Sequence, residues 1–460
     1  MTYILILFLT YVLHLLLKLN WVCTAVVLVF LLVMQHFHRI KGQRFQEARK
    51  RFLDVSLYID TLLYSFLKEQ KIIRAFEDVK STLADGHMKE TVSRAIDHMM
   101  LTFDETEVFV DAMRIIEDEY KCNRIVNAHE FMAHAEYYGG DIKESARILL
   151  KDKSAWERRI LRNIEDRQRM FHQIILSVVT SVIISGIILY LPVLSMDISS
   201  NIIVQILSAA LIVLDDLIIL WGQKFLEVDY LGIDLLPEDD KHAKKLDEYK
   251  AYNPAKELRT SILMAIIPAL ASAFLLYTDR QWPAVAAMGA ALICLNQHRI
   301  GHRLMKKNLI ADVKSAFPKW LMDLALLIQS ENVQVAIQKS REHIPVILKE
   351  EVNTLVERLD VEPESSDPYH RFLDCLNLPE INAAMGMLYA VSIGNSGNCG
   401  SQIDELITKN LEMLDVADTA RLKDKTAGMY LLFLAPVITA SFKMIVDMAI
   451  FLIKLFIYTR

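Results

Sequence analysis

Long apolar runs alternate with charged stretches along this chain, and the first run is too long for a single span. It extends from Tyr3 to about Phe37 and is interrupted midway by Lys18 and Asn20. As one helix it would measure about 50 Å, whereas the hydrocarbon core of a bilayer is about 30 Å thick. We therefore interpret the run as a tight helical hairpin that crosses the membrane twice and is retained in the mature protein.

Further apolar runs predict more membrane spans, and the basic residues between them predict an orientation. These runs are Gln173–Leu191, Asn201–Trp221, Ser261–Tyr277, Trp282–Leu295 and Ala427–Ile457. Lys and Arg are concentrated in 38–172, 222–259 and 298–425, and are sparse in the short loops at 18–20, 192–200 and 278–281. The positive-inside rule then predicts a protein of the cell (inner) membrane whose N-terminus and three basic segments lie on the cytoplasmic side. Lys18 is a small exception, because a lysine near an interface can snorkel.

The last run allows two interpretations. Ala427–Ile457 is too long for one untilted span, and Lys443 and Asp447 lie near its middle. It is either a second hairpin or one span followed by an amphipathic tail, and we favour the hairpin with the C-terminus inside. At i, i+4 spacing, Lys443 and Asp447 either form an ion pair in the membrane or mark the turn of that hairpin.

Helical periodicity predicts two bundles outside the membrane. Apolar residues recur every three or four positions in 52–67 and again in 317–328. Pro318 fits the first turn of a helix that begins there. The charged stretch 228–256 reads as a solvated connector between the bundles. Each bundle segment exceeds 120 residues, which is enough for a core of its own.

The predicted fold is therefore all-α: a multi-spanning membrane protein with two cytoplasmic helical bundles. In chain order its parts are a transmembrane hairpin (1–37), a helical domain (38–172), a transmembrane pair (173–221), a charged linker (222–259), a second transmembrane pair (260–297), a second helical domain (298–425) and a C-terminal transmembrane part (426–460). The order of hairpin, bundle and membrane occurs twice, which suggests duplication or fusion.

Composition excludes several classes of protein. The chain is 53% hydrophobic with only 14 glycines and 11 prolines, which disfavours a β-barrel and favours long helices. A net charge of −6 gives no indication of nucleic-acid binding. The five cysteines lack the clustered spacing of a disulfide framework or a zinc site, so we read them as small apolar side chains. No cofactor or metal is predicted.

Glycines late in each bundle are interpreted as helix-ending turns. Gly139 and Gly140 stand in the sequence Ala-Glu-Tyr-Tyr-Gly-Gly-Asp, and Gly400 stands in a glycine-rich stretch of the second bundle. Glycine readily adopts the left-handed conformation that ends a helix. A phosphate-binding loop would need Gly-x-x-x-x-Gly-Lys-Ser/Thr, which is absent from the sequence.

These features resemble the F-domain of type II secretion and type IV pilus inner-membrane platform proteins. The resemblance is carried by the Gly139–Gly140 turn followed by a charged helix and a span. In the second half, Phe317–Ala325, Leu378–Ile381 and the Ala435-Pro436 span are similar to the tight-adherence pilus branch. The resemblance covers nearly the whole chain, as two tandem F-domains. The equivalent stretches 67–70 and 330–332 lack the acidic-Ala-Gly turn that the family often has. The resemblance implies an oligomeric platform that docks a cytoplasmic assembly ATPase and pilin or pseudopilin subunits.

Charged residues inside or beside the spans are the main candidate functional positions. Asp215 and Asp216 lie within an apolar run, where charge is costly. They are a polar helix–helix contact, a subunit-handling site or an interfacial acid reached by water. An intramembrane aspartyl protease is disfavoured, because its Gly-x-Gly-Asp motif is missing.

Two further motifs lie in the first bundle. His129 and His134 resemble a zinc-peptidase pair, but their i, i+5 spacing puts them about 140° apart on a helix, which favours a surface or capping role. The acidic residues Asp104, Glu105 and Glu107 are read as a solvated face, with a cation site or an ATPase-docking patch as the alternative.

Overall, the sequence predicts a platform protein rather than an enzyme. Its bundles would offer surfaces to a partner ATPase, its spans would contact the lipid bilayer, and it would form a homo-oligomer. A membrane transporter or channel with a repeat architecture is the alternative, because charged midplane residues and repeats are common in that class. Alanine at Asp215 and Asp216 separates the two by its effect on filaments or on solute flux.

Overall fold

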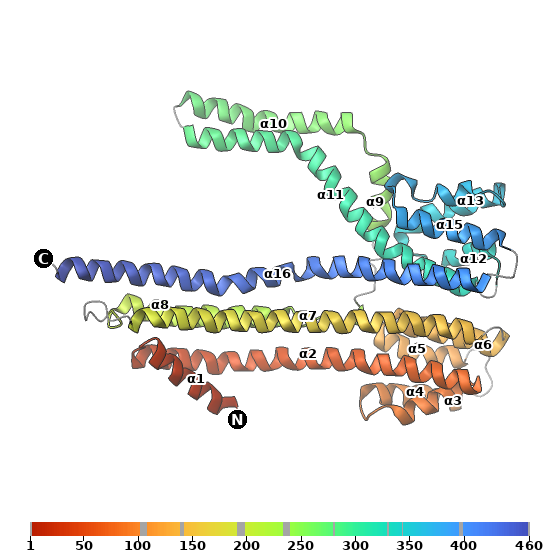
Figure 1. Cartoon of the computed structure of the whole chain (residues 1–460), viewed down its shortest axis with the longest axis horizontal. Coiled ribbons are helices and arrows are strands. Elements are labelled where there is room, and N and C mark those ends of the chain that lie inside the picture. The colour runs from red at the N-terminus through yellow and green to blue at the C-terminus, as the bar shows by residue number, and fades with distance from the viewer. Residues whose placement is uncertain are drawn as a thin grey trace. The chain divides into compact units, whose positions relative to one another are not determined.

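Every regular element in the described part of this computed structural model is helical (Figure 1). The description covers residues 2–101, 108–138, 142–190, 198–232, 240–278, 281–328, 331–342, 344–394 and 399–458. The chain forms two compact units. The first unit comprises Met1–Tyr138, Leu149–Asp234 and Leu422–Arg460, and the second comprises Gly139–Ile148 and Leu235–Arg421.

Five described helices are long and apolar enough to cross a membrane, so the chain has the make-up of a multi-pass membrane protein. They are α2 (Trp21–Glu69), α7 (Ile142–Tyr190), α8 (Ile202–Lys224), α10 (Pro254–Tyr277) and α16 (Cys399–Tyr458). The shorter apolar helix α1 (Thr2–Leu16) precedes them. The predicted span at Trp282–Leu295 belongs to α11 (Gln281–Leu327), which is not among the five because polar residues follow its apolar part at once.

The predicted break in the first apolar run is confirmed. Between α1 and α2, Lys18 adopts a left-handed backbone conformation (φ 44°), and the Asn20 side chain caps α2 by accepting a bond from the Cys23 N–H. The Lys18 ammonium donates to the carbonyl of Leu189 near the end of α7 over 2.9 Å. A cation at a helix C-terminus is favourable, so this bond accounts for the lysine in an otherwise uncharged loop.

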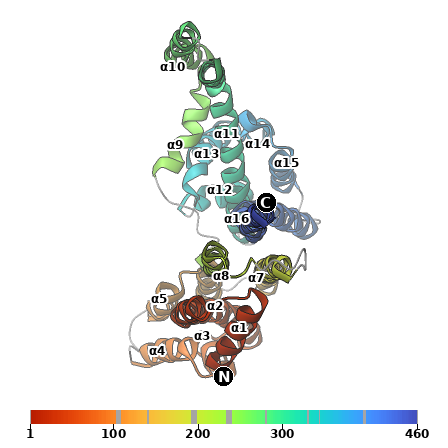
Figure 2. The ribbon, with the colours of Figure 1, turned by 90° about the vertical axis from the view of Figure 1, so that its left-hand side faces the viewer.

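The membrane helices of the first unit continue without a break into its bundle. Figure 2 views α2, α7 and α8 along their axes, side by side. The bundle consists of the second half of α2, α3 (Ile72–Thr82), α4 (His87–Leu101), α5 (Val108–Tyr120), α6 (Asn123–Tyr138) and part of α7. The predicted apolar face of 52–67 is confirmed, since Phe52, Val55 and Leu62 are fully buried. Phe52 meets Trp156 of α7 edge to face at 4.9 Å.

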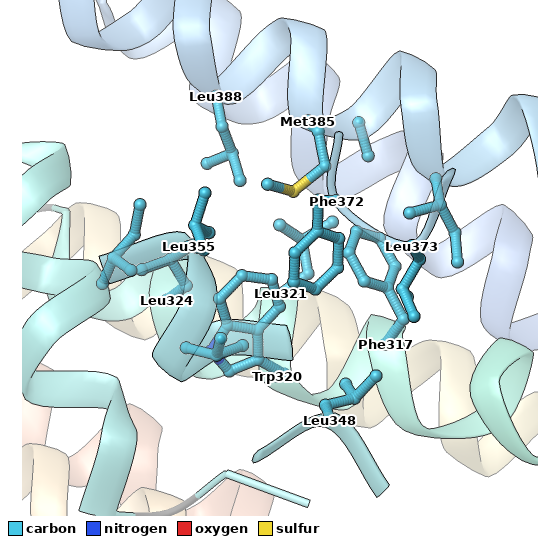
Figure 3. Close-up of a cluster of buried hydrophobic side chains, with 14 of the residues drawn as sticks. Phe317, Trp320, Leu321, Leu324, Leu348, Leu355, Phe372, Leu373, Met385 and Leu388 are labelled. Carbon is cyan, nitrogen blue, oxygen red and sulfur yellow. The ribbon is translucent and has the colours of Figure 1, made fainter. Parts of the chain in front are cut away.

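The second unit is built on the end of α11. Its other elements are α9 (Asp240–Lys250), α10, α12 (Val333–Lys339), η2 (Ser340–Glu342), η3 (Val346–Leu348), α13 (Lys349–Val361), α14 (Asp367–His370), η4 (Asp374–Leu376), α15 (Pro379–Ile393) and the start of α16. Figure 3 shows the rings of Phe317, Trp320 and Phe372 packed against one another, with leucines of the surrounding helices around them. The predicted apolar face of 317–328 is thus buried.

Three local expectations are wrong. Pro318 lies deep inside α11 rather than in a first turn, because the helix runs on from its apolar part into the bundle. The connector is not simply solvated: Leu246 of α9 is 1% exposed in the second core, and Lys245 pairs with Asp312 at 2.8 Å. The C-terminal run is not a hairpin, since α16 is one continuous helix through Lys443 and Asp447.

The hairpin of α10 and α11 packs through small side chains. Ala265, Ala284 and Ala291 are buried between the two helices, and the Ser272 hydroxyl donates to the Ala284 carbonyl over 3.0 Å. Large apolar residues point outward instead; Ile267 and Trp282 are examples. Small residues at the contact and large ones outside are typical of helix pairs in lipid.

Candidate functional site

Asp215 and Asp216 contact different helices in the first unit. Adjacent residues on a helix point about 100° apart, so one helix can present two carboxylates to two neighbours. Asp216 faces α2, where its Oδ1 lies 3.2 Å from Nε2 of His38. Gln223 lies two turns beyond Asp216 on the same face of α8, and its Oε1 is 2.9 Å from the other ring nitrogen of His38. This cluster ties α2 to α8.

Asp215 faces the other way, toward α7 and α16. Its Oδ2 lies 3.3 Å from the Ser181 hydroxyl, and its Oδ1 lies 3.3 Å from the Thr439 hydroxyl. The residue is only 2% exposed. The prediction that Asp215 and Asp216 make polar helix–helix contacts therefore has a specific geometry. From its place on α8, Asp215 therefore contacts hydroxyl groups of both α7 and α16.

A ladder of serines on α7 extends this contact. Ser177, Ser181 and Ser185 recur at every fourth position on one face, and each is at most 6% exposed. The Ser177 hydroxyl donates to the Phe433 carbonyl of α16 over 2.8 Å. The Ser185 hydroxyl has no hydrogen-bond partner among the described residues. Hydroxyls on one face of a span are typical of close helix–helix contacts in membranes.

Lys443 and Asp447 form an ion pair within α16. Lys443 Nζ lies 2.5 Å from Asp447 Oδ2, and both side chains are at most 2% exposed. Of the two readings left open by the sequence, the ion pair is the one present. The second carboxylate oxygen of Asp447 has no partner among the described residues. Lys443 is one turn beyond Thr439, so the pair continues the polar track on α16.

The end of α8 is fastened to its neighbours by charge. Glu227 accepts bonds from Lys41 at 3.0 Å and from Arg44 at 2.8 Å, both on α2. Arg167 of α7 is 2% exposed and donates to the Phe225 carbonyl over 2.6 Å. These basic residues come from segments that the positive-inside rule assigns to one side of the membrane. Their contacts hold α2, α7 and the end of α8 together on that side.

His129 lies in the core of the first bundle, so the expectation of a surface or capping role is wrong for this residue. It is 1% exposed; the Tyr58 hydroxyl donates to its Nε2 over 2.6 Å, and its Nδ1–H donates to Glu117 over 2.7 Å. His134, by contrast, is exposed. No group of three or more His, Cys, Asp or Glu residues that could hold a metal occurs within the described ranges.

Burial makes the first bundle sensitive to acid. Burial lowers the pKa of His129 below its usual value of 6.5, although the bond to Glu117 acts in the opposite direction. The folded chain therefore prefers neutral imidazole, and the unfolded chain binds the extra proton as pH falls. We expect the melting temperature in detergent to be highest above about pH 6.5 and to fall as the pH decreases below it.

Two substitutions test this acid sensitivity. His129→Gln should flatten the acid limb of the melting temperature, whereas His134→Gln at the exposed position should leave it unchanged. An unaltered acid limb in His129→Gln would assign the effect to other groups.

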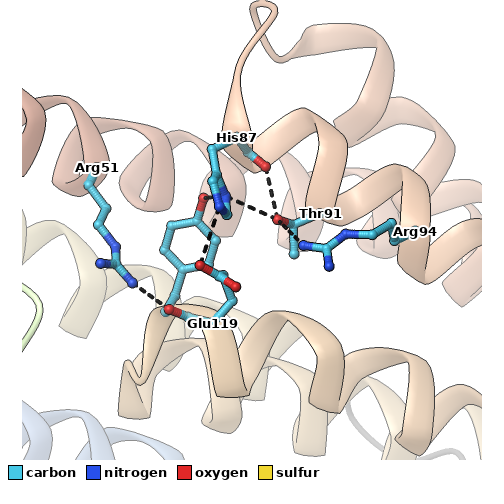
Figure 4. Close-up of polar contacts among 6 residues, drawn as sticks. Arg51, His87, Thr91, Arg94 and Glu119 are labelled. Carbon is cyan, nitrogen blue, oxygen red and sulfur yellow. Dashed lines mark hydrogen bonds and ion pairs between the residues drawn. The ribbon is translucent and has the colours of Figure 1, made fainter.

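A second polar cluster joins α2, α4 and α5 at the surface of the same bundle (Figure 4). His87 Nε2 lies 3.3 Å from Glu119, and the Arg51 guanidinium donates to the Glu119 carbonyl. The guanidinium also lies over the Tyr120 ring, 5.0 Å from its centroid. Burial is the main cause that raises the pKa of Tyr120 to about 12. In the acidic stretch 117–119, Glu117 and Glu119 therefore both have specific partners.

The remaining predicted positions divide into two groups. Gly139, Gly140, Asp104, Glu105 and Glu107 lie outside the described residues. Gly400 is the second residue of α16, inside the helix rather than in the turn before it.

The partners of Asp215 and Asp216 are residues that the sequence patterns did not single out. They are His38, Ser181 and Thr439. The four-residue spacing of serines in an otherwise apolar run was the available signal for one of them.

No protein-family model, curated protein or solved structure matches this chain.

Proposed function

We propose that this chain is an inner-membrane platform for the assembly of a pilus or a type II secretion pseudopilus. The observation that carries the proposal is the continuity of its helices. Single helices of 49 residues, α2 and α7, join an apolar, membrane-length segment to the helical bundle of the first unit. A rigid helix passes displacement at one end to the other, so an ATPase acting on a bundle could move the membrane part.

The polar contacts inside the first unit support this role. A platform that transmits force needs its spans held in register, and apolar side chains alone do not favour one helix over lipid. The bonds from Asp216 to His38 and from Asp215 to Ser181 and Thr439 link four helices at defined positions. In this proposal the chain carries out no bond chemistry itself; it docks an assembly ATPase and pilin-like subunits and forms a homo-oligomer.

Reconstitution with a partner ATPase tests the proposal. The purified chain should show no ATPase activity alone and should raise that of an assembly ATPase encoded nearby, which should also copurify from native membranes with a pilin-like protein. Charge reversal at Asp104, Glu105 and Glu107, for which an ATPase-docking patch is the alternative to a solvated face, should reduce the stimulation if the ATPase docks there. The matched control reverses Glu362 and Glu364, which are exposed in the second unit. Equal stimulation by an unrelated membrane protein would count against the platform.

A transporter or channel is the second candidate, and the buried Lys443–Asp447 pair favours it. Ionisable residues inside spans commonly line ion or substrate pathways. Alanine at Asp215 and Asp216 discriminates between the two functions. Loss of filaments with unchanged solute flux supports the platform, whereas loss of flux supports transport.

A further inference from the structure

The contact between Asp215 and Thr439 has one hydrogen atom too few if the carboxyl group is ionised. Thr439 carries one hydroxyl hydrogen, and its oxygen lies 2.9 Å from the Pro436 carbonyl but 3.3 Å from Asp215 Oδ1. A carbonyl oxygen and an ionised carboxylate can both only accept, so the single hydrogen goes to the closer of the two, the Pro436 carbonyl. A hydroxyl donating to a charged carboxylate would also lie closer, at about 2.5–2.7 Å. The Thr439–Asp215 contact therefore lacks a hydrogen unless the carboxyl group supplies one.

The surroundings of Asp215 also supply no compensating charge. Other acidic and basic side chains in the apolar parts of the helices around it are His36 and His38 on α2, His172 on α7, Asp216 on α8, and Lys443, Asp447 and Lys454 on α16. His38 pairs with Asp216, and Lys443 pairs with Asp447. Among the described residues, no basic group lies within ion-pair distance of Asp215. An isolated carboxylate in such a place is far less favourable than the neutral acid.

We propose that Asp215 is a proton-binding site inside the membrane part of the first unit. Its neutral carboxyl group donates O–H to Thr439 Oγ1 and accepts a bond from the Ser181 hydroxyl through its other oxygen. Every polar atom of the contact then has a partner. When the proton leaves, Oδ1 and the Thr439 oxygen repel each other, and the junction of α8 with α16 weakens. This property is independent of the platform role, since it rests only on the contacts of α7, α8 and α16.

Carbodiimide labelling in native membranes tests the proposal. The probe is the hydrophobic reagent dicyclohexylcarbodiimide, which reacts with protonated carboxyl groups in apolar surroundings, and mass spectrometry locates the label. We expect label on Asp215, at a rate that falls as the pH rises and the neutral acid loses its proton. Asp447, paired with Lys443, is the internal comparison and should react much more slowly.

Infrared spectroscopy provides a second readout that does not depend on access of the reagent. The carbonyl stretch of a protonated carboxylic acid should be present in the parent protein and absent in Asp215→Asn. Thr439→Val should shift this band by removing the acceptor, and Thr439→Ser should restore it. An unchanged band in Asp215→Asn would overturn the proposal. Suppression of the label by Na⁺ at constant pH would also overturn it, in favour of a cation held between the carboxylate and the two hydroxyls.

Discussion

Replacing Lys443 with alanine is expected to destabilise the first unit by about 3–5 kcal/mol, because it leaves the Asp447 carboxylate buried without its partner. The cost arises from the unpaired charge rather than from the strength of the pair. The double variant Lys443→Leu/Asp447→Leu should therefore recover most of the loss or exceed the parent in stability. Thermal unfolding in detergent, followed by the helical signal, measures both.

An exposed pair with the same spacing serves as the control. Arg371 and Asp367 lie 2.7 Å apart at i, i+4, with side chains 62% and 51% exposed. Alanine at Arg371 should change stability by less than about 1 kcal/mol. If the Lys443 and Arg371 variants lose stability equally, the buried pair has no special cost and the environment assigned to Lys443 is wrong.

Trp320→Ala is expected to destabilise the second unit by about 3–5 kcal/mol. The indole is fully buried, stacks on Phe372 at 5.5 Å and donates its N–H to the Ser340 hydroxyl over 2.9 Å. Its removal leaves a cavity in the core shown in Figure 3 and takes away the bond that the Ser340 hydroxyl accepts, while that hydroxyl still donates to the Ile337 carbonyl. Trp320→Phe fills most of the space and should lose less.

Amide hydrogen exchange measures the loss separately for each unit, since a chain with two units need not unfold in one step. Protection of α13 and α15 should fall in Trp320→Ala while protection of α5 and α6 is retained. Trp282→Ala is the matched control, because that indole is 88% exposed on α11. Equal loss of protection in the two variants would contradict the assignment of Trp320 to the core.

Local patterns in the sequence predicted local features well. The apolar spacing at Phe52 and Phe317 marked the two buried faces, and Lys18 and Asn20 marked the first helical break. The residue at which a helix begins was harder to predict. Pro318 suggested a helix start, yet α11 passes through it, because the packing of Trp320 and its neighbours stabilises the helix on both sides.

The C-terminal run and the polar core depended on information that periodicity does not contain. Two charges in an apolar run suggested a turn, but Lys443 and Asp447 neutralise each other across one helical turn, so no turn is needed. Asp215 meets Ser181, 34 positions away, and Thr439, 224 positions away. Only the folded chain brings such partners together, which is why the sequence identified the aspartate but not its neighbours.

The first unit is assembled from three separate stretches of chain, and this has a consequence for biosynthesis. Its last stretch, Leu422–Arg460, supplies Thr439 and the Phe433 carbonyl, which face Asp215 and Ser177. Ribosomes add about 5–20 residues per second, so Asp215 waits about 10 to 45 seconds for Thr439 to be made. During that interval α8 resides in the bilayer with Asp215 lacking its Thr439 partner, and any quality-control protease that recognises polar spans can act then. The polar junction around Asp215 is therefore complete only once α16 has been made.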